Sequence, residues 1–185
     1  MTYAVEDVSD IVELCGGVSA PAWVFVRCQR SGGAITSYCI IVSNEIGCKT
    51  LYYWNKSGTK LDMRRYKHLF SDMYVLQKEK TAEDAVRNLH DFFCDRRVVC
   101  FDAQETYYPL CCLFEGNGNE PRGDILDLQE TAKAIFKSKE DFNLNSVMGY
   151  LGMEGTKKEH VIDQINDVLA IHAKLERLGL LEINR

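Results

Sequence analysis

The chain has 185 residues, of which 46% are hydrophobic and 26% charged, and its formal net charge is −5. These values are ordinary for a soluble globular protein of one domain, and they exclude a protein that holds nucleic acid by overall basic charge. No apolar run reaches the roughly 18 residues that a membrane span needs. The acidic N-terminus also lacks the basic start and apolar middle of a signal peptide, so we expect a cytoplasmic protein.

The first 20 residues carry apolar side chains at roughly helical spacing and predict an N-terminal arm or short helix. Three strand-like runs follow, at residues 23–29, 35–43 and 48–54. Glycine-containing turns separate these runs, so the three strands are predicted to form an antiparallel meander.

After the meander, strands alternate with helices. A short helix is expected within residues 60–70, and Thr81 is placed to cap a longer helix through Phe93. Buried strands are predicted at 97–101 and 125–128, and helices at 110–114, 129–136, 144–151 and 159–180. This order predicts an α/β fold in which a mixed five-stranded sheet is flanked by helices, with residues 21–182 forming a single domain.

Eight cysteines are present, and none stands in a Cys-x-x-Cys pair. We therefore expect neither a zinc site nor a disulfide framework, but buried cysteines that pack as small hydrophobic side chains. A soft-metal or thiol site that combines Cys28, Cys100 and His160 is a separate hypothesis, because a sequence does not show proximity. A basic cluster at residues 56–67 is interpreted as a solvated surface, with nucleic-acid contact as the alternative.

Four stretches of the chain together resemble one enzyme family. They are residues 24–32, a strand ending in a glycine turn; 98–106, followed by Leu110; 124–128, with Ala132; and 144–153, followed by His160 and Asp167. In order and pattern they resemble the DEDD family of 3′–5′ exonucleases, which includes domains like those that proofread for polymerases. This resemblance implies the ribonuclease H-like fold for the sheet and helices predicted above.

The resemblance also implies a site. In this family, four carboxylates hold two divalent metal ions, which activate a water molecule and stabilise the leaving oxygen of a phosphodiester. Matched residue by residue, the two first-strand carboxylates become Arg27 and Gln29, and the middle carboxylate becomes Thr106. The last carboxylate becomes Asp167, beside His160 as the residue that assists the water, although their spacing is seven residues where five is usual. Matching Asp167 instead to the subfamily that uses tyrosine places Asp163 at the tyrosine position.

These departures predict a degenerate exonuclease that has lost two-metal hydrolysis. No Asp or Glu occurs between Glu13 and Glu45, so no shift of register returns a carboxylate to the first strand. We expect no cofactor, and a role as a nucleic-acid-end-binding module, with Arg27 as a possible phosphate contact, or as a protein-interaction module. The net negative charge favours a protein partner. The alternative is an active exonuclease that binds Mg²⁺ or Mn²⁺ through Asp163 and Asp167. The identity of the partner and the oligomeric state are left open.

Overall fold

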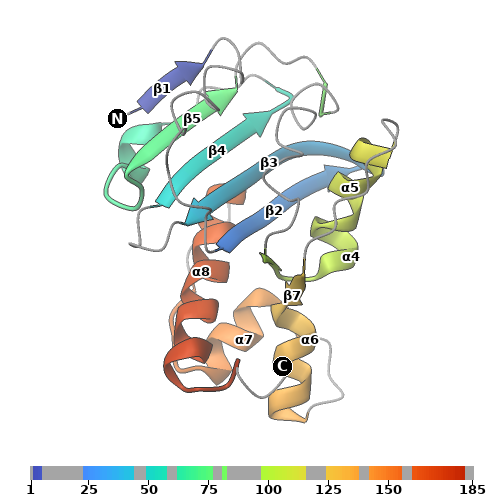
Figure 1. Cartoon of the computed structure of the whole chain (residues 1–185), viewed down its shortest axis with the longest axis vertical. Coiled ribbons are helices and arrows are strands. Elements are labelled where there is room, and N and C mark those ends of the chain that lie inside the picture. The colour runs from blue at the N-terminus through green and yellow to red at the C-terminus, as the bar shows by residue number, and fades with distance from the viewer. Residues whose placement is uncertain are drawn as a thin grey trace.

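A seven-stranded sheet forms the centre of the molecule (Figure 1). The structure is a computed structural model, and it describes residues 2–5, 23–43, 49–57, 62–76, 81–82, 97–115, 124–137, 142–155 and 160–181. The strands lie in the order β1-β5-β4-β3-β2-β6-β7. Their bounds are β1 Thr2–Val5, β2 Trp23–Ser31, β3 Ala34–Ser43, β4 Lys49–Asn55, β5 Asp72–Leu76, β6 Val98–Cys100 and β7 Ile125–Asp127.

The predicted meander and the parallel strands are both present. Strands β2, β3 and β4 pair in antiparallel fashion, whereas β6 runs parallel to β2, and β7 runs parallel to β6. The turn between β2 and β3 has positive φ angles at Gly32 (57°) and Gly33 (85°), a conformation that glycine adopts without steric cost. The mixed sheet flanked by helices predicted from the sequence is therefore confirmed.

Two strands extend this sheet beyond the five that were predicted. Strand β5 runs parallel to β4, and β1 runs parallel to β5 at the edge. Residues 2–5 are thus strand, and the expectation of a short helix was wrong for them; residues 6–22 lie outside the described residues. Most of the helix expected after Thr81 and the turn expected at 44–47 also lie outside them. Strands β1 and β5 have only four and five residues, and an alternating pattern over so few residues is a weak signal.

The helices cover the two faces of the sheet separately. Helices α4 (Ala103–Thr106) and α5 (Tyr108–Glu115) pack on one face, against Val26 and Tyr38 among others. Helices α6 (Leu128–Phe136), α7 (Leu144–Tyr150) and α8 (Val161–Arg177) belong to a second core, on the face that carries Phe25 and Cys39. The 3-10 helix η1 (Met63–Tyr66) contributes Tyr66 to the second core. Strand β2 therefore lies between two cores.

Helix α8 is the main cover of the second face. Its apolar residues recur at helical spacing and are buried: Val161, Ile165, Val168, Ile171 and Leu175. Its contacts run mainly to β2 and β3. None of the described helices is long and apolar enough to cross a membrane.

Candidate functional site

Arg27 joins three elements from the middle of β2. Because side chains alternate along a strand, Arg27 points to the same face as Phe25, which is the face that α8 covers. Its Nε donates to Gln164 Oε1 on α8 at 3.0 Å, and its Nη1 donates to the carbonyl oxygen of Phe101, just after β6, at 2.8 Å. The guanidinium of this β2 residue is therefore fixed between the end of β6 and the first turns of α8.

The hydrogen-bond partners of the Arg27 guanidinium are uncharged. Burial lowers the pKa of Arg27, and nearby acidic groups, including Asp102 and Glu105, act in the opposite direction. A guanidinium nevertheless stays protonated at any physiological pH. Both of its hydrogen bonds go to uncharged oxygens, and no carboxylate among the described residues forms an ion pair with it. A partly desolvated cation without a counter-charge is electrostatically suited to an anion.

A cavity of about 240 Å³ lies beside the guanidinium. Its lining is mostly polar, and four of its side chains are amides: Gln129, Asn143, Asn145 and Gln164. Asp102 is the single carboxylate among the described residues of that lining, and its side chain accepts a hydrogen bond from the Glu105 backbone N–H at 3.2 Å. The cavity thus combines a fixed cation with amides that can donate, which is the composition of a site for a small polar anion.

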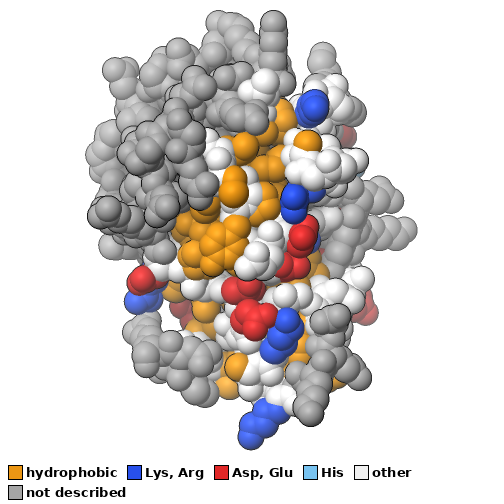
Figure 2. Space-filling view, turned by 90° about the vertical axis from the view of Figure 1, so that its right-hand side faces the viewer, with side chains coloured by type: hydrophobic (Ala, Val, Ile, Leu, Met, Phe, Trp, Pro, Cys, Tyr) orange, Lys and Arg blue, Asp and Glu red, His pale blue; other side chains and the backbone are white. Residues whose placement is uncertain are grey.

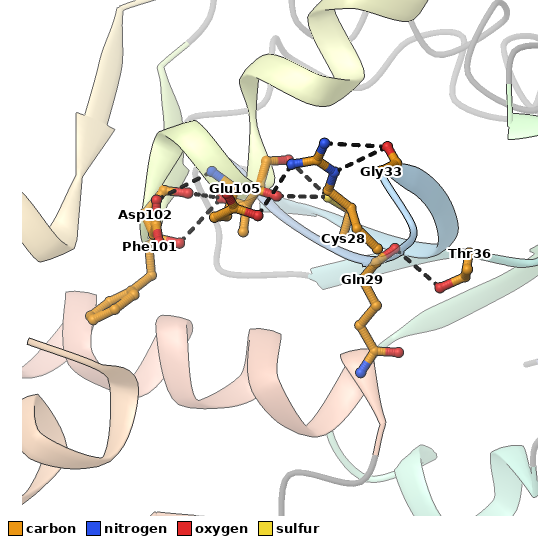
Figure 3. Close-up of polar contacts among 9 residues, drawn as sticks. Cys28, Gln29, Gly33, Thr36, Phe101, Asp102 and Glu105 are labelled. Atoms are coloured by element: carbon orange, nitrogen blue, oxygen red, sulfur yellow. Dashed lines mark hydrogen bonds and ion pairs between the residues drawn. The ribbon is translucent and has the colours of Figure 1, made fainter.

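Gln29 lies on the same face of β2 as Arg27, as its spacing on the strand predicts. Its Oε1 accepts a hydrogen bond from Ser37 Oγ at 3.0 Å, and its carbonyl oxygen accepts one from Thr36 Oγ1 at 3.2 Å. Figure 3 shows its side chain turned toward the helix that covers this face. This position therefore carries an amide that is hydrogen-bonded to the neighbouring strand.

Thr106 closes the turn after β6. Its side chain is buried, and its Oγ1 donates to the carbonyl oxygens of Phe101 and Asp102 at 3.2 and 2.7 Å. The hydroxyl therefore ties α4 back to the strand end. Its role in the structure is local and does not require a metal ion.

A half-buried carboxylate, that of Asp127, holds the same turn in place. Asp102 has a positive φ of 62°, which a residue other than glycine adopts only when its surroundings fix it. The carboxylate of Asp127 accepts hydrogen bonds from the backbone N–H groups of Asp102 at 3.1 Å, Ala103 at 2.8 Å and Gln129 at 2.9 Å. It thereby fixes the carbonyl of Phe101 that receives Arg27.

Asp163, an acidic residue of α8, lies in other surroundings than Arg27. Asp163 is buried; its Oδ1 accepts a hydrogen bond from the Tyr66 hydroxyl at 3.2 Å and lies 3.5 Å from Arg65 Nη2. Burial, followed by the charge of Asp163, raises the pKa of Tyr66 to about 12. Asp167 is also buried, and His160 is the half-buried N-cap of the helix. The α8 side chain that meets Arg27 is Gln164.

Sequence reasoning overlooked Gln164. It stands four residues after His160, so both lie on one face of the helix. That spacing was visible, but a search for carboxylates passes over an amide. Arg27 on β2 and Gln164 on α8 thus face one another, and neither side chain carries negative charge.

The residues present do not fit two divalent metal ions. A guanidinium only donates hydrogen bonds, and the Thr106 hydroxyl is bonded to two carbonyl groups. The other polar side chains described around the cavity are four amides and one carboxylate, that of Asp102, which caps α4 through the Glu105 N–H. Among the described residues, no three His, Cys, Asp or Glu side chains are grouped so as to hold a metal ion. The ligand set that the family chemistry requires is therefore not assembled around Arg27.

The hypothetical thiol site is not assembled either. Cys28 and Cys100 belong to the core on the α4 and α5 side of the sheet, whereas His160 begins the helix on the other side. The Cys28 thiol lies 3.3 Å from the carbonyl oxygen of Glu105, and burial raises its pKa to about 11. Both thiols thus behave as buried, protonated side chains.

Comparison with known proteins supports the fold. No known protein family matches the sequence, and no curated protein is similar to it in sequence. Among solved structures, the X-ray structure of the RNase domain of the yeast Pop2 protein is similar, with a TM-score of 0.56 and 13% sequence identity. The similarity covers 96% of this chain and 86% of that one. The chain therefore has an exonuclease-like, ribonuclease H-like fold, as predicted.

Proposed function

We propose that this chain is an exonuclease-like domain that no longer hydrolyses phosphodiesters and instead binds the phosphate-bearing end of a nucleic acid. The observation that carries the proposal is the position of Arg27, fixed beside a polar cavity by hydrogen bonds to Gln164 and the Phe101 carbonyl. In this proposal, Arg27 supplies the positive charge that metal ions supply in the family that the sequence resembles.

The loss of hydrolysis follows from charge and ligand type. Divalent metal ions bind to carboxylate oxygens, and a nearby guanidinium repels them. Two-metal catalysis also needs both ions, one for the attacking and one for the leaving oxygen. Strand β2 carries Arg27 and Gln29 at the matched positions, and the Thr106 hydroxyl is bonded to carbonyl groups. These three positions therefore supply no negative charge to hold either metal ion.

Anion binding follows from the hydrogen-bonding capacity that remains. A guanidinium has five N–H donors, and the two hydrogen bonds of Arg27 leave others for a ligand. Gln164 accepts from Arg27 through Oε1, so its amide N–H₂ is a further donor. A phosphate group offers several acceptor oxygens, and arginine binds such a group in a bidentate manner.

The net charge of −5 of the protein restricts its contact with a nucleic acid to the end of the nucleic-acid strand. A long nucleic acid would be repelled by an acidic surface, whereas one terminal phosphate meets only the local field of Arg27. Contact with one or two phosphates of a single strand predicts a slope of about −0.7 to −1.4 in a plot of log K against log salt concentration. A slope several times steeper would indicate a different, extended basic site.

Two other functions remain candidates. Protein interaction is favoured by the same negative net charge, and in that case the cavity beside Arg27 is incidental. An active exonuclease would need Mg²⁺ or Mn²⁺ bound through a non-standard set of ligands that includes Asp163 and Asp167. In each case a cytoplasmic protein is expected.

The test is the affinity for a fluorescent single-stranded ten-nucleotide RNA with a 3′-phosphate, measured by anisotropy at low salt. We expect Arg27→Met to weaken binding about 10-fold or more, and Asn145→Asp, which places a negative charge at the exposed rim, to weaken it several-fold. Arg64→Glu, an exposed change on η1, is the matched control and should alter affinity less than about twofold.

The same assay with DNA, and with a 3′-hydroxyl in place of the phosphate, identifies which end is bound. Absence of measurable binding by the parent protein at low salt would remove the proposal and favour a protein partner. Equal losses in Arg27→Met and Arg64→Glu would contradict the assignment to this cavity. Asn145→Asp keeps the test valid if substitution of Arg27 disturbs folding, because Asn145 is exposed.

A further inference from the structure

A larger cavity lies on the other face of the sheet. Its volume is about 520 Å³, and its lining comes from the β2–β3 hairpin, the end of β4, and helices α4 and α5. Ile35 and Trp54, which line it, belong to the core on the α4 and α5 side. None of the described residues that line it also lines the cavity beside Arg27. It is therefore a separate site, independent of the function proposed above.

The charge of this cavity is opposite to that of the whole chain. Arg30 and Lys56 line it, and none of the described residues that line it is acidic, although the chain has a net charge of −5. Apolar groups such as Leu113 form much of the remaining wall. Two cations beside an apolar wall are suited to a ligand that joins an anionic group to a flat or apolar body.

The two cations are positioned by the hairpin. Arg30 donates from Nε and Nη2 to the carbonyl oxygen of Gly33 at 3.4 and 3.2 Å, and its Nη1 forms an ion pair with Glu105 at 3.2 Å. Glu105 is 64% exposed, so solvent weakens its hold on this charge. The backbone N–H of Lys56 donates to the Thr36 carbonyl at 2.9 Å, which fixes the start of an exposed side chain.

An aromatic ring completes the site. Tyr108 lines the cavity and is 43% exposed, and its ring packs edge-on against Tyr107 with the centroids 5.7 Å apart. Figure 2 looks onto this side of the molecule and shows hydrophobic side chains gathered in the centre, with basic side chains close to them. An exposed ring beside two cations is the combination on which nucleobases stack while phosphates are neutralised.

We propose that this cavity binds a nucleoside phosphate, with the base against Tyr108 and the phosphate between Arg30 and Lys56. Two cations match the double charge of a terminal phosphate better than the single charge of a carboxylate. The volume of about 520 Å³ lies within the range of sites for small molecules. The Gln104 side chain, which also lines the cavity, offers a donor and an acceptor to the edge of a base.

The test is the binding of adenosine 5′-monophosphate, adenosine and inorganic phosphate to the full chain, measured by isothermal titration calorimetry. We expect the nucleotide to bind at least about 10-fold more tightly than either part alone, because it uses the ring and the cations together. Cytidine and guanosine monophosphates are titrated in the same way. The proposal is supported if any of the three nucleotides binds more tightly than its nucleoside and than inorganic phosphate by that factor. Inorganic phosphate binding as tightly as the nucleotides, or no binding of any nucleotide at millimolar concentration, would overturn it.

Matched variants assign the binding to this cavity. Lys56→Glu and Tyr108→Ala should each weaken nucleotide binding at least fivefold, and both residues are exposed. The controls are Lys67→Glu and Tyr150→Ala, which change an exposed lysine and an exposed tyrosine outside the cavity. Arg27→Met should leave nucleotide affinity unchanged, which separates this site from the one proposed for a nucleic-acid end. Equal losses in the controls, or a loss in Arg27→Met alone, would contradict the assignment.

Discussion

Strand β2 and helix α8 are in contact through two regions that differ in chemistry. Near the start of β2, the ring of His172 packs edge-on against Trp23 and Phe25, with centroids 4.7 and 5.2 Å apart. At its middle, Arg27 is joined to Gln164 by a hydrogen bond of 3.0 Å. One region is aromatic and buried, and the other is polar and opens into a cavity.

The difference shows how fold and site chemistry can separate along one strand. Burial of apolar surface in the first region stabilises the domain whatever residues stand in the second region. Carboxylates in the second region would serve catalysis and not packing, so the sheet and helices do not depend on them. The predictions below test whether the two regions are as independent as this comparison implies.

The largest effect on stability is expected from Phe25→Ala in the aromatic region. Phe25 is buried between the sheet and α8, so its truncation should lower the free energy of unfolding by about 3–5 kcal/mol. Urea denaturation gives the change, and Leu178→Ala, at a 51% exposed position, is the control with an expected effect below about 1 kcal/mol. Oligonucleotide affinity of the folded variant should stay within about twofold of the parent; a large loss would show that the regions are coupled.

The second effect is expected from Asp127→Ala, which removes the carboxylate that holds the turn after β6. Three backbone N–H groups lose their acceptor, and we expect a loss of about 2–3 kcal/mol in the free energy of unfolding. Because this turn positions the Phe101 carbonyl, oligonucleotide binding should weaken as well. Glu130→Ala on the same helix is the control, since Glu130 is exposed and pairs only with Lys133 within the described residues. Equal stability of the two variants would contradict this role.

The third effect is a loss of stability in acid that arises from His172. Burial lowers the pKa of His172 below its ordinary value of 6.5, so the unfolded chain binds a proton that the folded chain resists. The contribution of neutral His172 to the free energy of unfolding is present above pH 6.5. It is lost as the pH falls below that value, by at most about 1.4 kcal/mol per pH unit. Urea midpoints at several pH values measure it. His172→Phe should flatten the dependence below pH 6.5, and the exposed His68→Phe should not.

The smallest effect on stability is expected from Arg27→Met. Removing a partly desolvated cation offsets the loss of its two hydrogen bonds, so the free energy of unfolding should change by no more than about 1 kcal/mol. Arg97→Met is the matched change in the aromatic region, where Arg97 lies over the Trp23 ring at 5.4 Å; its effect on stability should be similarly small. Only Arg27→Met should weaken oligonucleotide binding, and equal binding by both variants would remove the distinction between the regions.

The sequence predicted the parts of the fold that carry strong periodicity. Alternation along residues 23–29 placed Arg27 and Gln29 on one face, and apolar spacing along 159–180 predicted helix α8; both predictions are confirmed. Strand β1 was missed because the apolar residues among the first 20 were interpreted at helical spacing, and no strand was predicted over residues 72–76, where β5 lies. Their places in the sheet depend on parallel pairing with distant segments, which local sequence does not encode.

The candidate site was predicted in part. Which side chain of α8 meets β2 depends on the rotation of the helix, and that rotation is set by the packing of Ile165 and Val168. This packing brings Gln164 to Arg27, while Asp163 meets Tyr66. A catalytic role for His160 or Asp167 remains a prediction.

The most direct test of the central claim is an exonuclease assay on the parent protein. Single-stranded RNA and DNA labelled at the 5′ end are incubated with Mg²⁺ or Mn²⁺, and the products are compared with those formed in the presence of a chelator. The account predicts intact oligonucleotides in every case, because Arg27, Gln29, Thr106 and Gln164 supply no carboxylate for a metal ion. Metal-dependent shortening from the 3′ end that Asp167→Ala abolishes would contradict it.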